Sequence, residues 1–426
     1  MKYRSSDHPK VNQLTDNIRD SFYYSCVSNQ INLIFNGSVH KQFSGIYKDL
    51  VDLCEHEVEV KVLLYHSLLS YKRQTKGFTV CLRVEEFTKI KQTTKHKVCS
   101  YRKFTSVLST LVSNGYGTLY VGDRTVDPTS YKSVFVMSDK FINLFSGKNK
   151  NFFPTITNSI PYDDLVLVMS EKDKKGNRTR LQGIRGTRPL KNTAKKINDF
   201  LAKFEFRDGN GNRFYPEVYR SFIGGLFNYG RWYFSVQNMK SSARSGITID
   251  GETVSEWDFS SNHSRICACL CGVVLEDTFK PYNISEKGLV TKVPEDGSER
   301  DVYKMGMMCL LNCKGNHSTA LKNAWTKDLH GYEGKENSKY IIRGLKETNH
   351  EYMTEIKKQD AGSLQYIDSC IMEETMLYLV DREIPFLPYH DSILVTSSCT
   401  VAEDALRYAW EKVLGTKNNC VIDKKF

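Results

Sequence analysis

A strand that runs directly into a helix, with a carboxylate at the junction, constrains the fold of this chain most strongly. Residues 247–259 place Asp250-Gly251, a strong hairpin signal, between two runs of β-prone residues. The second run ends at Asp258, and Ser260 or Ser261 can cap a following helix. The Asp258 carboxylate therefore projects from a rigid edge. Because strand-terminal aspartates often only cap helices, this segment alone leaves a structural role open.

A second segment, residues 384–396, is apolar on both sides of a polar centre that contains His390 and Asp391. This pattern predicts a hairpin with both residues at its tip. The Asp391 carboxylate in so apolar a stretch needs a charged partner or a metal ion. If Asp391 lies close to Asp258, the two negative charges repel each other. Two Mg²⁺ ions, or Mn²⁺ in their place, remove that conflict and suit transfer of a nucleotide to a 3′-hydroxyl. His390 holds a nucleic-acid backbone, orients a carboxylate, or is structural.

Between these segments, Arg300, Lys304, Met308 and Asn312 recur every fourth residue. This spacing predicts that the four side chains line one face of a helix. Two cations at one end of the face suit a triphosphate, and the other two residues would then lie under the nucleotide. An ordinary basic helix produces the same spacing by chance.

In this order the segments resemble motifs A, B and C of the family A polymerase superfamily, which includes family A DNA polymerases and single-subunit phage-type RNA polymerases. The stretch from Asp258 to Arg265 is similar to motif A, Arg300-x-x-x-Lys304 to the fingers-helix motif, and His390-Asp391-Ser392 to motif C. The resemblance covers roughly residues 220–400. It implies a palm-and-fingers right hand in which Asp258 and Asp391 bind two Mg²⁺ ions and Lys304 contacts the incoming triphosphate.

The resemblance also implies contacts to a primer and template. Gln365 lies in a segment similar to the helix that precedes motif C in this superfamily. Arg231 and Arg244 belong to a region that resembles polymerase-like proteins of mobile elements, which makes a mobile element or virus a candidate source. With Arg265 and His390, these residues form the expected primer and template surface.

The sugar of the substrate stays open. His263 stands where family A DNA polymerases carry a residue that excludes a ribose 2′-hydroxyl, which favours dNTPs. His-Asp-Ser and Met308 are closer to the RNA polymerases, and Asn312 replaces the usual tyrosine. We favour a DNA polymerase and keep an RNA polymerase or primase as the alternative.

The N-terminal part contains one readable unit. Apolar residues from Phe104 to Val112 follow a helical period, and residues 116–121 and 133–137 favour two strands after it. With an earlier helix near residues 60–71, this is the layout of a winged helix, and it carries basic residues suited to phosphates (Lys97, Arg102, Lys103, Arg124, Lys132). A non-enzymatic DNA-binding replication initiator is therefore another alternative, and a nuclease using His390 and Asp391 a weaker one.

We expect an α+β fold in three parts. Residues 1–158 form a helical and winged-helix-like nucleic-acid-binding region, residues 159–205 a basic linker and helix, and residues 206–426 the palm and fingers. In the middle part we expect Pro189 to break the basic segment and a helix to follow from Thr193 to Phe204. The net charge of +11, spread along the chain, favours polyanionic partners. No secretory signal or membrane-spanning run is visible, so we expect a soluble intracellular protein in the cytoplasm, an organelle or a virus factory. The twelve cysteines lack zinc-site spacing and are expected to be free thiols.

Overall fold

The chain forms two compact units in the computed structural model. Unit 1 combines Met1–Leu165, Lys195–Val218 and Phe234–Val254, and unit 2 combines Val166–Ala194, Tyr219–Tyr233 and Ser255–Phe426. Within these bounds the structure describes residues 11–13, 24–27, 39–82, 87, 99–122, 132–149, 151, 160, 162–174, 176, 178–284, 298–313, 315–328, 337–358 and 361–426. The units interleave along the chain, whereas the three expected parts are consecutive; those parts stay a prediction.

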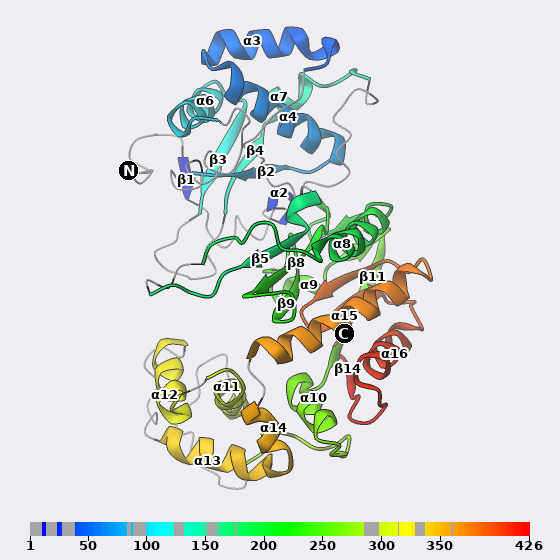
Figure 1. Ribbon diagram of the computed structural model, residues 1–426. Coiled ribbons are helices and arrows are strands. Elements are labelled where there is room, and N and C mark those ends of the chain that lie inside the picture. Colours follow the sequence, from blue (N-terminus) through cyan, green and yellow to red (C-terminus); the bar gives the residue numbers. More distant parts are fainter. Residues whose placement is uncertain are drawn as a thin grey trace. The chain divides into compact units, whose positions relative to one another are not determined.

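Unit 1 has a helical layer on a four-stranded sheet (Figure 1). The strand order is β1-β3-β4-β2, with β4 antiparallel to both its neighbours and β1 parallel to β3. In chain order the main elements are α3 (Ser44–Cys54), α4 (Glu57–Arg73), β2 (Gly77–Val80), α6 (Tyr101–Ser113), β3 (Gly117–Val121) and β4 (Ser133–Met137). The shorter ones are β1 (Val11–Gln13), α2 (Tyr24–Val27) and α7 (Asp139–Asn143).

The predicted helix and two strands of this unit are confirmed. The apolar stripe of α6 is buried in the unit's core, together with residues of α4 and of the sheet. Strands β3 and β4 match the predicted residues to within one position, and α4 contains the earlier predicted helix. Lys97 and Arg124, expected on the basic side, lie outside the described residues.

Short strands complete unit 1. They are β6 (Phe206–Arg207), β7 (Arg213–Phe214) and β10 (Thr248–Ile249), with α9 (Ser241–Arg244) before β10. The predicted Asp250-Gly251 turn is confirmed, because Ile249 pairs with Glu252 across it and both turn residues have positive φ (49° and 86°).

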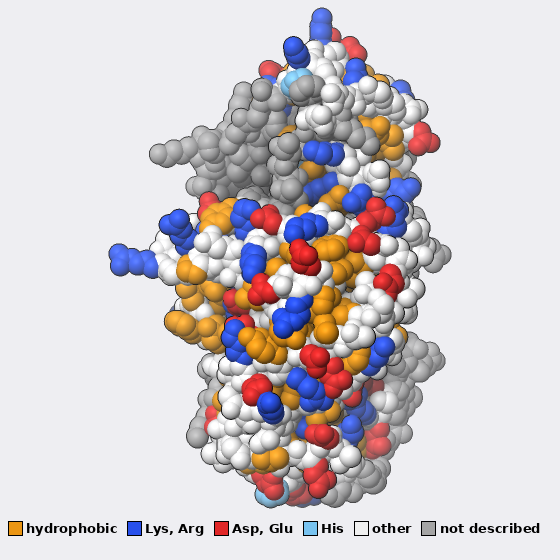
Figure 2. Space-filling model, turned by 90° about the vertical axis from the view of Figure 1, so that its right-hand side faces the viewer, with side chains coloured by type: hydrophobic (Ala, Val, Ile, Leu, Met, Phe, Trp, Pro, Cys, Tyr) orange, Lys and Arg blue, Asp and Glu red, His pale blue; other side chains and the backbone are white. Residues whose placement is uncertain are grey.

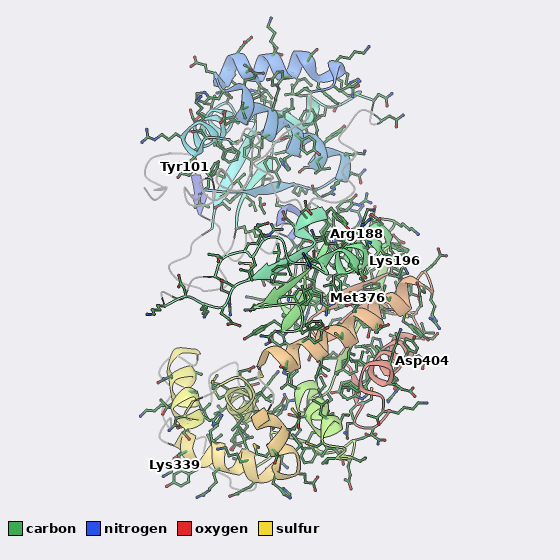
Figure 3. All side chains as sticks on the ribbon, viewed as in Figure 1. Tyr101, Arg188, Lys196, Lys339, Met376 and Asp404 are labelled. Carbon is green, nitrogen blue, oxygen red and sulfur yellow. The ribbon has the colours of Figure 1, made fainter. Side chains whose placement is uncertain are left out.

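The basic helix predicted after residue 193 starts earlier. α8 spans Thr187–Leu201, and Arg188 and Lys196 project from it (Figure 3). Pro189 was expected to interrupt this region, but it occupies the first turn of the helix. A proline is tolerated there because the first N–H groups have no helical partner.

The antiparallel sheet of unit 2 carries the sequence motifs. β12 (Phe386–Tyr389) and β13 (Ser392–Thr396) form the predicted hairpin, and β13 lies next to β11 (Glu252–Phe259). β14 (Ile422–Lys424) pairs antiparallel with the end of β11. Pro388 fits because β12 is an edge strand.

Helices surround this sheet and form the segment between the motifs (Figure 1). α10 (Asn262–Leu270) follows β11, and α15 (Ala361–Val380) packs on α16 (Ala402–Leu414). Between them lie α11 (Glu299–Asn312), α12 (His317–Asp328), α13 (Ser338–Thr348) and α14 (Met353–Lys358). Gly306 allows α11 to approach α13, since a Cβ there would stand 2.7 Å from Leu345 Cδ1.

A smaller sheet of unit 2 contains β5 (Val166–Met169), β8 (Val218–Ile223) and β9 (Tyr229–Phe234), in the order β5-β8-β9. The hydrophilic stretch 170–180 forms an exposed loop that returns to β5, where Leu181 N–H donates to the carbonyl of Val168 at 2.8 Å. The predicted α+β class with an antiparallel sheet is confirmed.

The surface charges are mixed in sign, and the cysteines form no disulfides. Figure 2 shows Lys and Arg side chains mixed with Asp and Glu on the face in view, not gathered in one patch. All twelve cysteines are free thiols. In the part of the chain that the structure describes, no helix has the length and apolar character needed to cross a membrane.

Candidate active site

Asp258 lies one residue before the end of β11, where the strand passes into α10. The N-cap of α10 is Ser261, so Asp258 does not have the capping role that the sequence left open. Ser261 does not cap through its side chain as predicted, because its backbone is left-handed (φ 54°) and no side-chain cap bond forms. The tight bend leaves the Asp258 carboxylate at the strand edge.

Asp391 reaches the same place from the β12–β13 hairpin. His390 and Asp391 form the two-residue turn between Tyr389 and Ser392, as predicted. His390 has φ 55°, a conformation that a histidine adopts only at a cost and that often marks functional sites. Phe259 N–H points to the carbonyl of Asp391 at 3.5 Å. The two predicted carboxylates are therefore neighbours.

The electrostatics of the pair are unfavourable without a cation. Burial and the negative charges of Asp258 and Asp368 raise the pKa of Asp391 to about 7. Burial also raises the pKa of Asp258, although its hydrogen bond to Lys425 opposes that shift. Asp258 Oδ1 is buried and has no hydrogen-bond partner among the described residues.

Lys425 and Glu256 complete the strand face that carries Asp258. Glu256 is fully buried, and its Oε1 accepts hydrogen bonds from Lys425 Nζ at 2.8 Å and Ser392 Oγ at 3.2 Å. Lys425 Nζ also lies 2.7 Å from Asp258 Oδ2. One ammonium group thus bridges two carboxylates that are two residues apart on β11.

The predicted cationic face of α11 is confirmed. Arg300, Lys304 and Met308 are exposed, and Asn312 is partly exposed and donates to the Met308 carbonyl at 2.8 Å. Burial raises the pKa of Asp258, and the positive charge of Lys304 opposes that shift, so Lys304 lies within electrostatic range of Asp258.

Tyr282 connects the start of α11 to the carboxylates. The Arg300 guanidinium lies 5.4 Å from the centre of the Tyr282 ring, and the Tyr282 hydroxyl is hydrogen-bonded to Ser261. Burial is the main cause that raises the pKa of Tyr282, and the charges of Asp391 and Asp258 act in the same direction.

Asp368, on α15, lies close to three polar side chains: those of Asn262, Arg231 and His263. It is buried, and its Oδ1 accepts a hydrogen bond from Asn262 Nδ2 at 2.7 Å. Arg231 NH2 lies 3.8 Å and His263 Nε2 3.9 Å from its Oδ2. Since Asp368 and His263 both influence the pKa of Asp391, the predicted residues Arg231 and His263 belong to the same cluster.

One of the expected primer or template contacts has another role. Arg265 is buried, and its NH2 donates to the carbonyls of Glu276, Asp277 and Phe279 at 3.0–3.3 Å. The expectation for Arg265 is therefore wrong, because its guanidinium holds the loop after α10. Arg244 belongs to unit 1, and its contact with a primer or template stays a prediction.

Gln365 and His390 are both accessible to solvent. Gln365 is partly exposed on the first turns of α15, the helix predicted before the second hairpin. His390 is exposed at the hairpin tip beside Asp391. Their contact with a primer or template stays a prediction.

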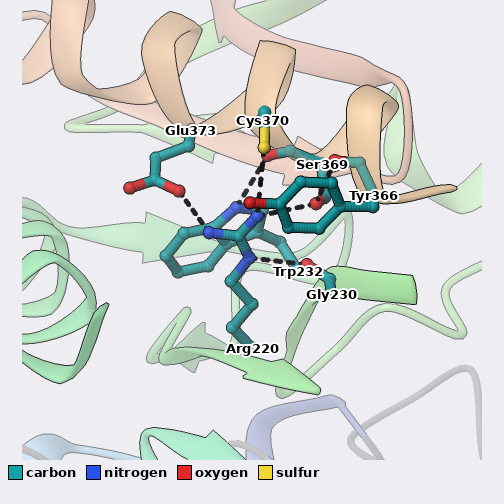
Figure 4. A network of polar contacts seen from close by, with 7 residues as sticks. All are labelled: Arg220, Gly230, Trp232, Tyr366, Ser369, Cys370 and Glu373. Carbon is teal, nitrogen blue, oxygen red and sulfur yellow. Dashed lines mark hydrogen bonds and ion pairs between the residues drawn. The ribbon is translucent and has the colours of Figure 1, made fainter. Parts of the chain in front are cut away.

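A buried arginine that the sequence did not reveal fixes α15 to the small sheet (Figure 4). Arg220 Nε donates to the Gly230 carbonyl at 2.6 Å, NH2 donates to Ser369 Oγ at 2.7 Å, and NH1 pairs with Glu373. The guanidinium also lies 5.3 Å from the centre of the Trp232 ring. The network holds the helix that carries Asp368.

The donor set fits a hard divalent cation in part. Asp258 and Asp391 offer carboxylate oxygens, the ligands Mg²⁺ and Mn²⁺ prefer, and the Asp258 oxygen without a partner is suited to one. Within the described ranges, no group of three or more His, Cys, Asp or Glu side chains is arranged to hold a metal ion. Remaining ligands must then come from substrate phosphates and water, as is common for Mg²⁺.

Four site residues were missed at the sequence level: Glu256, Tyr282, Asp368 and Lys425. Glu256 had a usable signal, since residues two apart on a strand share a face. Asp368 lay three residues after Gln365, one helical turn along a helix already identified. Nothing in the local pattern indicated Tyr282 or Lys425, because tertiary packing alone brings them to the site.

No protein-family model and no curated protein matches the chain. Among solved structures, the chain is similar to the POL domain of Pol1 from M. smegmatis in complex with DNA primer-template and dNTP. The match has 11% identity and a TM-score of 0.31, and it covers 90% of this chain. The chain spans 65% of the length of that structure.

Proposed function

We propose that the chain is a template-directed nucleotidyltransferase that adds nucleotides from nucleoside triphosphates to a 3′-hydroxyl. One observation carries the proposal: Asp258 and Asp391 become neighbours through a strand end and a hairpin turn, and Lys304 of α11 lies within electrostatic range of Asp258. Carboxylates opposite a cationic helix suit a triphosphate with bound metal ions. The motif resemblance supports the same activity.

In this reaction the 3′-oxygen forms a bond to the α-phosphorus, the bond to the bridging oxygen of the β-phosphate breaks, and pyrophosphate leaves. The hydroxyl proton passes to solvent. Bound divalent cations, held by Asp258 and Asp391, would activate the attacking oxygen and stabilise the leaving group. Lys304 and Arg300 neutralise the triphosphate, and Met308 and Asn312 lie under the nucleotide.

His263 is the proposed sugar gate. It extends from α10, and its Nε2 lies 3.9 Å from Asp368 Oδ2. A ring in this position disfavours a 2′-hydroxyl, so we favour dNTPs, with an RNA polymerase or primase as the alternative. Arg231, Gln365 and His390 supply contacts to primer and template.

The test is extension of a labelled primer–template with Mg²⁺, run in parallel with dNTPs and rNTPs, with Asp391→Asn as control. We expect extension by wild type, a preference for dNTPs, and no extension by the variant. His263→Ala should reduce the preference. Absence of extension with both nucleotide sets, with and without primer, would contradict the proposal.

Unit 1 favours a second function, binding of duplex nucleic acid. Among the described residues, α6 is followed by the antiparallel strands β3 and β4, and β4 lies between β3 and β2, which supports the predicted winged-helix layout. α6 contains no acidic residue and exposes Arg102 and Lys103 at its first turn. If the chain bound DNA without any synthesis, this unit would support the alternative of a replication initiator.

A further inference from the structure

Lys425 is placed at the active-site carboxylates by backbone pairing. Residues 422–424 pair with residues 257–259, and one step further Lys425 N–H donates to the Glu256 carbonyl at 2.9 Å. Opposite residues of an antiparallel pair project to the same face. The register therefore directs the Lys425 side chain to Glu256 and Asp258, at 2.8 and 2.7 Å.

The side chain of Lys424 projects from the other face of the strand pair and serves as a comparison for Lys425. It pairs with Trp257, and its Nζ lies 5.3 Å from the centre of a Trp257 ring. The two lysines are adjacent on one strand and carry the same charge. Only Lys425 contacts a carboxylate of the candidate site.

The two carboxylates hold Lys425 in different ways. Glu256 Oε1 is buried and also accepts from Ser392, so it forms the inner anchor of the ammonium group. Asp258 Oδ2 is the outer contact, on the residue proposed to bind a divalent cation. A divalent cation that binds Asp258 meets both the positive charge of Lys425 and its hydrogen bond to this carboxylate.

We propose that Lys425 is a positioning residue that holds Asp258 in place through Oδ2 before a divalent cation arrives, and that its positive charge opposes binding of that cation to the same carboxylate. The ammonium group thereby sets the metal concentration at which the site fills. The inference rests on the proposed function through the assumption that Asp258 binds a divalent cation.

The test is direct measurement of Mn²⁺ binding to the full chain, by electron paramagnetic resonance and titration calorimetry, without nucleotide. Lys425→Met keeps the aliphatic stem and removes the charge, and Lys424→Met is the matched control. We expect Lys425→Met to lower the Mn²⁺ dissociation constant about fivefold. Lys424→Met should leave it unchanged.

The outcomes separate the inference from the function. Equal or weaker Mn²⁺ binding in Lys425→Met, with wild type binding normally, would overturn the role of Lys425 and leave the proposed function standing. No saturable binding in any of the three proteins would overturn the metal site itself. If Lys425→Met fails to fold, Lys425→Gln provides the same comparison.

Discussion

Two charged clusters of unit 2 differ in how their charges are balanced. Around Arg220, one cation meets one carboxylate, a hydroxyl, a carbonyl and aromatic rings, so that the buried charge is compensated. Around Asp391, burial and then the neighbouring carboxylates raise its pKa to about 7, and Asp258 keeps an oxygen without a partner among the described residues. The first arrangement is suited to stability, and the second is suited to binding a cation.

The largest effect is expected at the carboxylates. Asp258→Asn and Asp391→Asn should each lower nucleotide incorporation about a thousandfold or more, since each removes a proposed metal ligand worth several kcal/mol in the transition state. Nucleic-acid binding should stay intact, because these groups do not hold phosphates. The control is Asp404→Asn, an exposed position on α16 (Figure 3). Full activity in either variant would remove that residue from the site.

The next largest effect is expected in the cluster around Arg220. Arg220→Met removes the buried partner of the partly exposed Glu373 and the hydrogen bonds to Gly230 and Ser369, and should lower the free energy of unfolding by about 2–4 kcal/mol. Urea denaturation measures this, with Arg188→Met on the exposed face of α8 as control. Adding Glu373→Gln should restore part of the loss. If Arg220→Met alone were as stable as wild type, the Arg220 network would not stabilise the fold.

In the carboxylate cluster around Asp391, removing a charge should stabilise the fold instead of destabilising it. The folded-state pKa of Asp391, about 7, lies above its usual value near 3.9, so ionised Asp391 destabilises the metal-free fold. In chelator, Asp391→Asn should be more stable than wild type by about 2–4 kcal/mol above pH 7. The difference should shrink as pH falls toward 4, where wild-type Asp391 is protonated in the folded state. A difference independent of pH would contradict the assignment.

A smaller effect is expected on α11. Lys304→Ala removes a charge from the proposed triphosphate site and should raise the KM for nucleotide about tenfold, with slower incorporation. Lys339→Ala, on an exposed position of α13, is the control (Figure 3). An unchanged nucleotide dependence would exclude Lys304 from the site.

The smallest effect is expected for DNA binding by unit 1, which is proposed to be independent of the carboxylate site in unit 2. Replacing Arg102 and Lys103 of α6 by alanine should reduce the salt dependence of duplex DNA binding by about two counterions. The substitution Lys48→Ala on α3 serves as the control. Equal salt slopes for the double variant and wild type would argue against the winged-helix surface.

The sequence predicted those parts of the fold that depend on local pattern. The Asp-Gly turn, the stripe of α6, the hairpin tip and the face of α11 each have short-range signals, and all four are confirmed. Arg265 was misplaced because a motif does not reveal burial. Pro189 was misread because its tolerance depends on the position within a helix.

The remaining parts depend on contacts between distant residues. Lys425 lies 169 positions from Glu256, and Arg220 lies 153 positions from Glu373. No periodicity links such residues. The order of the motifs indicated a carboxylate site, whereas its balance of charge became visible only in the fold.

The central claim, that Asp258 and Asp391 hold divalent cations at one site, is tested most directly by Fe²⁺-mediated backbone cleavage. Fe²⁺ bound in place of Mg²⁺ generates hydroxyl radicals that cut the chain beside the metal. We expect cuts near both the end of β11 and the β12–β13 turn, suppressed by excess Mg²⁺ and lost in Asp258→Asn. Cuts at only one of these segments, or cuts unaffected by Mg²⁺, would contradict a shared site.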